Sequence, residues 1–210
     1  RSPTATRPTT CCIPTTPSAA SIDRPLKGIN LRPVRLHRPH DYLRVFKEGI
    51  EINEVLRALK SQKTTRRDQF SNRPVEPEAL DQIREAILKT ANASNRQSYS
   101  VLSLDAEHAQ GLRLPGKHVF IFCLDFHRLK RCAERLGVDF DSRYLMQFIT
   151  AQTDISMFAQ SAILAAQSLG IDTLLTNEIY HLRLDEVFGK LQIPDRDVFP
   201  MLALCLGYAK

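Results

Sequence analysis

The chain has 210 residues, of which 43% are hydrophobic and 25% are charged. These proportions suit one globular domain with enough length left over for an appendage. No run of 18 or more apolar residues occurs, so neither a transmembrane helix nor a membrane partner is expected.

The net charge of +6 is concentrated at the beginning of the chain. Residues 1–40 hold seven basic residues against the single acid Asp23, whereas residues 41–210 hold 22 basic and 22 acidic residues. The remainder of the chain therefore has no net positive field that would attract a polyanion. This balance argues against a nucleic-acid partner, although a nucleic-acid-associated protein acting through its basic tail stays open as an alternative.

The cysteines give no sign of a metal site or a disulfide framework. Their number is odd, and no CxxC or Cys/His spacing suggests zinc or an iron–sulfur cluster. We interpret them as small buried hydrophobic residues in a reducing compartment, which predicts a cytoplasmic protein. The five are Cys11, Cys12, Cys123, Cys132 and Cys205.

We assign residues 1–45 to a disordered tail and residues 46–210 to a folded domain, with order from about Glu51. The tail is rich in Pro, Thr, Ser and Arg, and it has too little apolar surface to offset the entropy of ordering. Its acid-poor composition also resembles an organelle transit peptide. The chain opens with Arg1 rather than Met, which leaves targeting open.

In the first half of the domain, helical spacing of apolar residues predicts a helix from Ile52 to Leu59. A polar loop follows at residues 61–67. The next helix is predicted to begin at Pro77 and to run to about Lys89, because proline suits the first helical position. After a loop at 92–98, Tyr99–Leu104 is predicted to be a strand.

In the second half, the longest helical pattern runs from about Asp154 to Leu169. It is apolar on more than one face, so this helix is expected at the centre of the domain. The element order describes a layered α+β domain rather than a regular βαβ winding. The other predicted elements are strands at His118–Leu124, Ile171–Thr176 and Phe199–Leu206, and helices at Leu129–Leu136 (ended by Gly137) and Leu184–Leu191.

Three polar segments could bind a ligand. The segment 62–67 (Gln-Lys-Thr-Thr-Arg-Arg) offers three cations and two hydroxyls, which can bind a phosphate monoester. The segment 93–99 contains Asn and Gln, which can read the edge of a heterocycle. The segment 175–178 follows a strand, where ligand contacts are common. Each segment alone is equally an ordinary loop or helix cap.

Taken together, in this order and spacing, the segments resemble the FMN-dependent nitroreductase family over about Glu51–Tyr208. The family has an Arg-Arg-Ser-x-Arg-x-Phe type segment, and residues 62–66 with Phe70 and Pro74-Val75 resemble it. Asn95-Arg96-Gln97-Ser98-Tyr99 is similar to the family's Asn-x-Gln-Pro-Trp type stretch. The long helix with Gly170-Ile171-Asp172, and the ending at residues 199–208, resemble the central helix and the last strand.

The resemblance implies a nitroreductase-like layered fold, with a mainly antiparallel sheet flanked by helices and a long buried central helix. It also implies a homodimer with two flavin sites at the interface, each built from both subunits. By the same resemblance, Lys63, Thr64, Arg66 and Arg67 would hold the FMN phosphate and ribityl chain. Ser94, Asn95 and Gln97 would meet the isoalloxazine ring, and Thr176, Asn177 and Glu178 would lie beside its N5/O4 edge.

The sequence departs from the family pattern in four places. Gln62 and Lys63 replace an arginine pair, and Asp68-Gln69 are two additional residues before Phe70. Ser98 and Tyr99 replace Pro-Trp. Family members usually continue with an extension that wraps the partner subunit and adds a basic residue to the phosphate site, and the sequence given ends before it.

The activity that the resemblance implies is a ping-pong oxidoreductase, which passes hydride from NADH or NADPH through flavin N5 to a nitroaromatic, a quinone or a similar small acceptor. The chemistry belongs to the cofactor, so no catalytic side chain is predicted. The alternative is a non-catalytic or degenerate flavin-binding member that acts as a scaffold or regulator, an interpretation favoured by the ending at Lys210.

Overall fold

A four-stranded sheet forms the centre of the fold in the computed structural model, which describes residues 53–194 and 196–210. The strand order is β1-β2-β4-β3 and every neighbouring pair is antiparallel, which confirms the expected α+β class. The expectations for the tail lie outside the described residues. The strands are β1 (Tyr99–Asp105), β2 (His118–Asp125), β3 (Asp172–Thr176) and β4 (Val198–Gly207).

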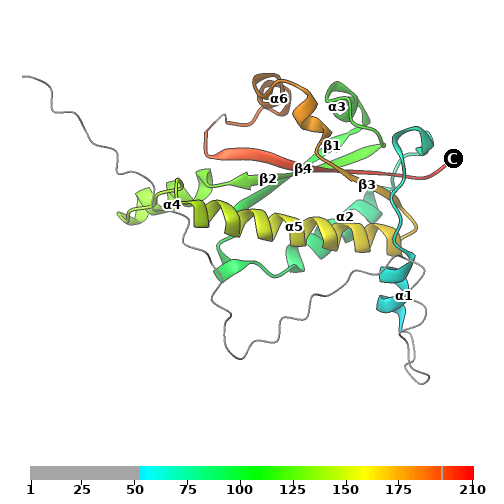
Figure 1. Ribbon diagram of the computed structural model, residues 1–210, viewed down its shortest axis with the longest axis horizontal. Coiled ribbons are helices and arrows are strands. Elements are labelled where there is room, and N and C mark those ends of the chain that lie inside the picture. Colours follow the sequence, from blue (N-terminus) through cyan, green and yellow to red (C-terminus); the bar gives the residue numbers. More distant parts are fainter. Residues whose placement is uncertain (1–52, 195) are drawn as a thin grey trace, which may run out of the picture. The chain divides into compact units, whose positions relative to one another are not determined.

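Both faces of the sheet are covered (Figure 1). The helices α2 (Pro77–Lys89) and α5 (Leu145–Ser168) pack on one face, together with Phe120 and Phe122 of β2. Successive side chains of a strand point to opposite faces. Val119 and Ile121 therefore belong to the core on the other face. That face is covered by α3 (Ala106–Gly111), α6 (Leu184–Leu191) and the 3₁₀ turn η4 (Glu178–His181).

The helix α5 is central, as predicted, but it begins at Leu145 rather than near Asp154. The predicted start was wrong, because Asp154 lies within the helix and is 3% exposed. Ile155, Phe158 and Ala162 follow it at helical spacing and are fully buried. Of the helices that the structure describes, none is long and apolar enough to cross a membrane.

The remaining elements follow the predicted order. One helix was not predicted, and one cysteine expected to be buried is exposed. The helix α3 was not predicted, because its six residues are too short to show a period. Cys132 is exposed rather than buried. It lies on α4 (His127–Leu136), whose buried residue is Ala133. The helix α4 ends at Gly137, whose φ of +64° suits glycine. The other elements are α1 (Glu54–Ser61) and the 3₁₀ turns η2 (Arg67–Gln69) and η3 (Ala93–Asn95).

Candidate functional site

The first predicted segment lies along the outer edge of β3. The backbone N–H of Thr65 donates to the carbonyl of Thr173 at 2.9 Å. The hydroxyl of Thr65 donates to Asp172 Oδ1 at 3.1 Å, and Lys63 Nζ lies 3.2 Å from the same oxygen. The second oxygen of Asp172 accepts the backbone N–H of Ala209 at 2.8 Å. Asp172 therefore joins this segment, the start of β3 and the end of the chain.

The charge of Asp172 is stabilised by these donors. Burial raises the pKa of this carboxyl, but the hydrogen bonds from Ala209, Lys63 and Thr65 and the charge of Lys63 outweigh burial, so its pKa lies below the ordinary value. The anionic form of Asp172 therefore holds Lys63, Thr65 and the backbone at Ala209 in place.

The third predicted segment lies against the first. Arg67 forms an ion pair with Glu178, and both residues line a cleft of about 260 Å³. The backbone N–H of Glu178 donates to Thr176 Oγ1 at 3.1 Å, so this N–H is already engaged within its own turn. Asn177 begins the turn η4 and is exposed. Two of the three predicted segments are thus joined by a direct contact.

Arg66 and Thr64 have exposed side chains that contact no carboxylate among the described residues. In this they differ from Lys63 and Arg67, which are paired with acids. The backbone N–H of Arg66 donates to Gln69 Oε1 at 2.8 Å, and this contact closes the turn η2. The two additional residues of the family comparison, Asp68 and Gln69, are accommodated in this turn. Phe70 follows this turn and is buried in the core.

The second predicted segment has a distinctive backbone. Ser94, Asn95 and Gln97 have φ angles of +52°, +51° and +53°, and all three are exposed. The backbone N–H of Ala93 donates to the buried carboxylate of Asp154 in α5, at 3.0 Å to Oδ1. The backbone of the segment is therefore anchored to the buried Asp154 of α5, while its polar side chains face solvent.

The contacts of this second segment lead away from the other two. Arg128 of α4 donates through Nη1 to Gln97 Oε1 at 3.3 Å, and through Nη2 to the Gln97 carbonyl. Arg96 donates to Gln147 Oε1 of α5 at 2.5 Å. The described contacts of one chain thus join the first and third segments and tie the second to α4 and α5.

Three residues of this arrangement were not predicted as site residues: Asp172, Asp154 and Arg128. Asp172 was visible as a charge at the start of an apolar strand, and Asp154 as the lone acid in an apolar helix. Arg128 carried no signal, because its contact with Gln97 depends on the pairing of β1 with β2.

The described residues thus form an α+β protein with an antiparallel sheet, a long helix on one face and two joined polar segments at the β3 edge. No protein-family model matches the chain. Curated relatives and solved structures do, and they carry the names of nitroreductases and FMN reductases. The chain is accordingly similar to proteins named as nitroreductases and FMN reductases, which confirms the resemblance seen in the sequence.

Two curated relatives illustrate the sequence similarity. The chain is 29% identical over 170 residues to "FMN reductase [NAD(P)H]" of Bacillus subtilis, covering 75% of this chain and 66% of the relative. It is 28% identical over 155 residues to "Oxygen-insensitive NADPH nitroreductase" of Salmonella typhimurium, covering 66% and 60%. The chain thus spans 60–66% of the length of these relatives.

Solved structures show the same fold. NfrA1 of B. megaterium superposes with a TM-score of 0.68 at 27% identity, covering 75% of this chain and 67% of that one. The NADPH:FMN oxidoreductase of Vibrio harveyi, solved with NAD⁺, has a TM-score of 0.66 at 20% identity, covering 75% and 70%, and supports the fold alone.

Proposed function

We propose that this chain is the flavin-binding domain of an NAD(P)H-dependent oxidoreductase of the nitroreductase type. The observation that carries the proposal is the direct contact between the segment 63–67 and the β3–η4 connection, through Lys63–Asp172 and Arg67–Glu178. It brings together two segments that the family resemblance assigns to one FMN. The relatives named as FMN reductase and NADPH nitroreductase support the same cofactor and reductant.

The phosphate end of FMN fits the residues of the first segment. Arg66 offers an exposed guanidinium, Thr64 offers an exposed hydroxyl, and Lys63 and Arg67 flank them. A guanidinium can donate two parallel hydrogen bonds to a phosphate, which makes Arg66 the main contact in this proposal. Lys63 and Arg67 would contribute less, because each already neutralises a carboxylate.

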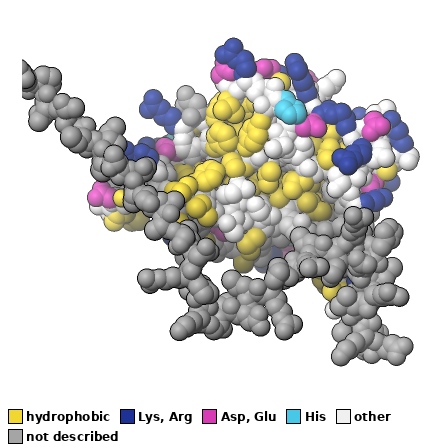
Figure 2. All heavy atoms as spheres, viewed as in Figure 1, with side chains coloured by type: hydrophobic (Ala, Val, Ile, Leu, Met, Phe, Trp, Pro, Cys, Tyr) yellow, Lys and Arg dark blue, Asp and Glu magenta, His cyan; other side chains and the backbone are white. Residues whose placement is uncertain are grey.

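The ring end of FMN would be completed by a second copy of the chain. Within one chain the contacts of Gln97 lead to α4 rather than to the β3 edge, and this supports a site to which Ser94, Asn95 and Gln97 come from the partner subunit. The first turns of α5 expose apolar side chains that a partner would cover: Leu145 is 69%, Met146 67% and Phe148 43% exposed. Figure 2 shows apolar side chains reaching the surface on this side of the molecule.

When bound, the flavin would supply hydride acceptance and donation at N5, first with a nicotinamide and then, by a ping-pong scheme, with a small acceptor such as a nitroaromatic or a quinone. The work of this chain is to bind and orient. Arg66 and Thr64 would fix the phosphate, and Gln97 and Asn95 would offer amide groups to the ring. Thr176 holds the N–H of Glu178 within η4 and so fixes the connection beside the ring. We place this activity in the cytoplasm.

The second candidate is a flavin-binding protein without turnover, which acts as a scaffold or regulator. A specific observation favours it: two of the four cations or hydroxyls assigned to the phosphate are already paired with acids, Lys63 with Asp172 and Arg67 with Glu178. Internal pairing lowers the net positive charge that a phosphate would meet, and so favours weak or exchangeable binding.

The purified full-length protein separates these candidates. An oxidoreductase binds FMN with a rise in melting temperature, is yellow, and bleaches when NADH or NADPH is added. A binder is yellow and is not reduced by either nicotinamide. A colourless protein whose melting temperature does not respond to FMN would contradict both.

A further inference from the structure

The loop before β1 contains three non-glycine residues with left-handed backbone, Ser94, Asn95 and Gln97. Side chains with a Cβ atom adopt this region rarely and at a cost in free energy, so such residues persist where neighbouring groups hold them. The side chains here are exposed, and packing around them therefore cannot supply the restraint. The restraint has to come from specific hydrogen bonds to the loop.

The pairing of β1 with β2 brings one such group close. Tyr99 at the start of β1 pairs with Leu124 near the end of β2. One step further out, the backbone N–H of Asp125 donates to the carbonyl of Ser98 at 3.1 Å. The chain that enters β1 and the chain that leaves β2 are therefore neighbours, and the first turn of α4 lies beside Gln97.

Arg128, in that first turn, contacts Gln97 at two points. One guanidinium nitrogen donates to the side-chain oxygen of Gln97 at 3.3 Å, and the other donates to its backbone carbonyl. The N–H of Gln97 donates to Asn92 Oδ1 at 3.3 Å. A planar guanidinium with two directed donors fixes both the backbone of Gln97 and the direction of its amide.

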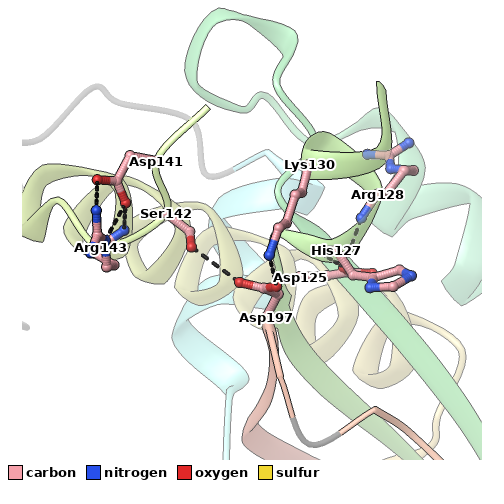
Figure 3. Close-up of polar contacts among 8 residues, drawn as sticks. All are labelled: Asp125, His127, Arg128, Lys130, Asp141, Ser142, Arg143 and Asp197. Carbon is pink, nitrogen blue, oxygen red and sulfur yellow. Dashed lines mark hydrogen bonds and ion pairs between the residues drawn. The ribbon is translucent and has the colours of Figure 1, made fainter. Parts of the chain in front are cut away.

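The helix that carries Arg128 is itself held at several points, as Figure 3 shows. Asp125 Oδ1 accepts the backbone N–H groups of His127 at 3.0 Å and Arg128 at 3.4 Å. On the other side, Asp197 accepts from Lys130 at 3.2 Å and from Ser142 at 3.1 Å. These contacts fix the first turn of α4, so Arg128 meets Gln97 from a defined position.

We propose that Arg128 is a positioning residue of the flavin site, which holds Gln97 in the left-handed conformation that presents its amide to the isoalloxazine ring. The inference rests on the proposed function. Arg128 acts through Gln97 and does not itself touch the flavin. One N–H of the Gln97 amide donates to Asn95 Oδ1 at 3.3 Å and so links the two side chains. The other N–H of Gln97 and the exposed amide of Asn95 are then presented in a fixed arrangement before the flavin arrives, which lowers the entropy lost on binding.

The test is a double-mutant cycle on the full-length protein, with FMN as the ligand and quenching of flavin fluorescence as the readout. Arg128→Ala should weaken FMN binding about tenfold or more, because a charge-assisted contact to the loop is lost. In the Gln97→Ala background the same change should cost less than about threefold, because the two residues act as a unit. Arg131→Ala is the control: it removes an exposed arginine of the same helix that has no hydrogen-bond or ion-pair partner in the described chain, and FMN affinity should not change.

The possible results separate clearly. An unchanged FMN affinity of Arg128→Ala, or an equal loss in both backgrounds, would overturn the positioning role. If Arg128→Ala does not fold, Arg128→Lys replaces it in the cycle, since lysine keeps the charge but lacks the fork; the loss should again depend on Gln97. A wild-type protein that binds no FMN would overturn the proposed function, and this inference with it.

Discussion

The segment 63–67 and the segment 94–97 are proposed to hold the same cofactor, but they are held in place by different forces. The first is an extended segment tied to β3 and η4 by carboxylates, Asp172 and Glu178. The second is a strained loop tied down by the buried Asp154 and by the guanidinium of Arg128. A segment held by partly exposed ion pairs should respond to pH and salt. A strained loop should respond instead to changes in packing and geometry beneath it.

The largest effect is expected from the support of the strained loop. Phe158 of α5 is fully buried, and its ring centroid lies 4.0 Å from that of Tyr99, which directly follows the loop. Phe158→Ala should lower the free energy of unfolding by about 3–5 kcal/mol, through lost burial and the cavity left behind. Urea unfolding followed by circular dichroism measures this. A loss under about 1 kcal/mol would show that α5 does not support the loop through this contact.

The next effect concerns the cofactor's phosphate. Arg66→Ala should weaken FMN binding by about 1.5–3 kcal/mol if Arg66 makes a charge-assisted contact. Isothermal titration with FMN and with riboflavin, which lacks the phosphate, measures the contrast. FMN affinity should fall towards that of riboflavin, while riboflavin binding is unchanged. Equal weakening of both ligands would place Arg66 at the ring rather than at the phosphate.

A smaller effect concerns the pH dependence of the first segment. The pKa of Asp172 is lower in the folded protein than its ordinary value, so its stabilising contribution is present above that value and is lost as the pH falls through the folded pKa. Asp172→Asn should therefore cost about 1 kcal/mol at pH 7. The difference in unfolding free energy between variant and wild type should shrink as the pH falls from about 5 to 3. A difference that stays constant over this range would exclude the carboxylate charge as the cause.

The smallest expected effect is a gain in FMN affinity. Glu178→Gln removes the charge that pairs with Arg67 and should strengthen FMN binding up to about fivefold, because exposed ion pairs contribute at most about 1 kcal/mol. Glu134→Gln serves as the control, since Glu134 is an exposed acid on α4, outside both segments. Titration at low and at high salt should show the gain shrinking as salt rises. Weaker FMN binding by Glu178→Gln would mean that Glu178 is itself a ligand-contacting residue.

The elements predicted accurately from the sequence were those with regular apolar spacing and clear start or stop residues. The strands β1 and β2 and the helices α2 and α6 begin and end within two residues of the prediction, because their apolar spacing and proline or glycine signals are local. The start of α5 was missed by nine residues, since Leu145–Ile149 carry apolar side chains that are exposed in this chain. A pattern shows which residues are apolar, and it does not show which of them the chain buries by itself.

The features of the candidate site also fall into those that local sequence patterns predict and those that depend on contacts between distant residues. The α+β class, the three polar segments and the residue types that suit a phosphate and a heterocycle could be read from the amino-acid sequence alone. The three-dimensional structure was needed to find that Lys63 and Arg67 are paired with acids more than 100 residues away, and that Arg128 contacts Gln97. Composition and periodicity arise from neighbours in the chain, whereas these contacts arise from strand pairing. The register of β1 with β2, and the path of residues 63–65 along β3, bring together residues whose spacing in the sequence carries no trace of the contact.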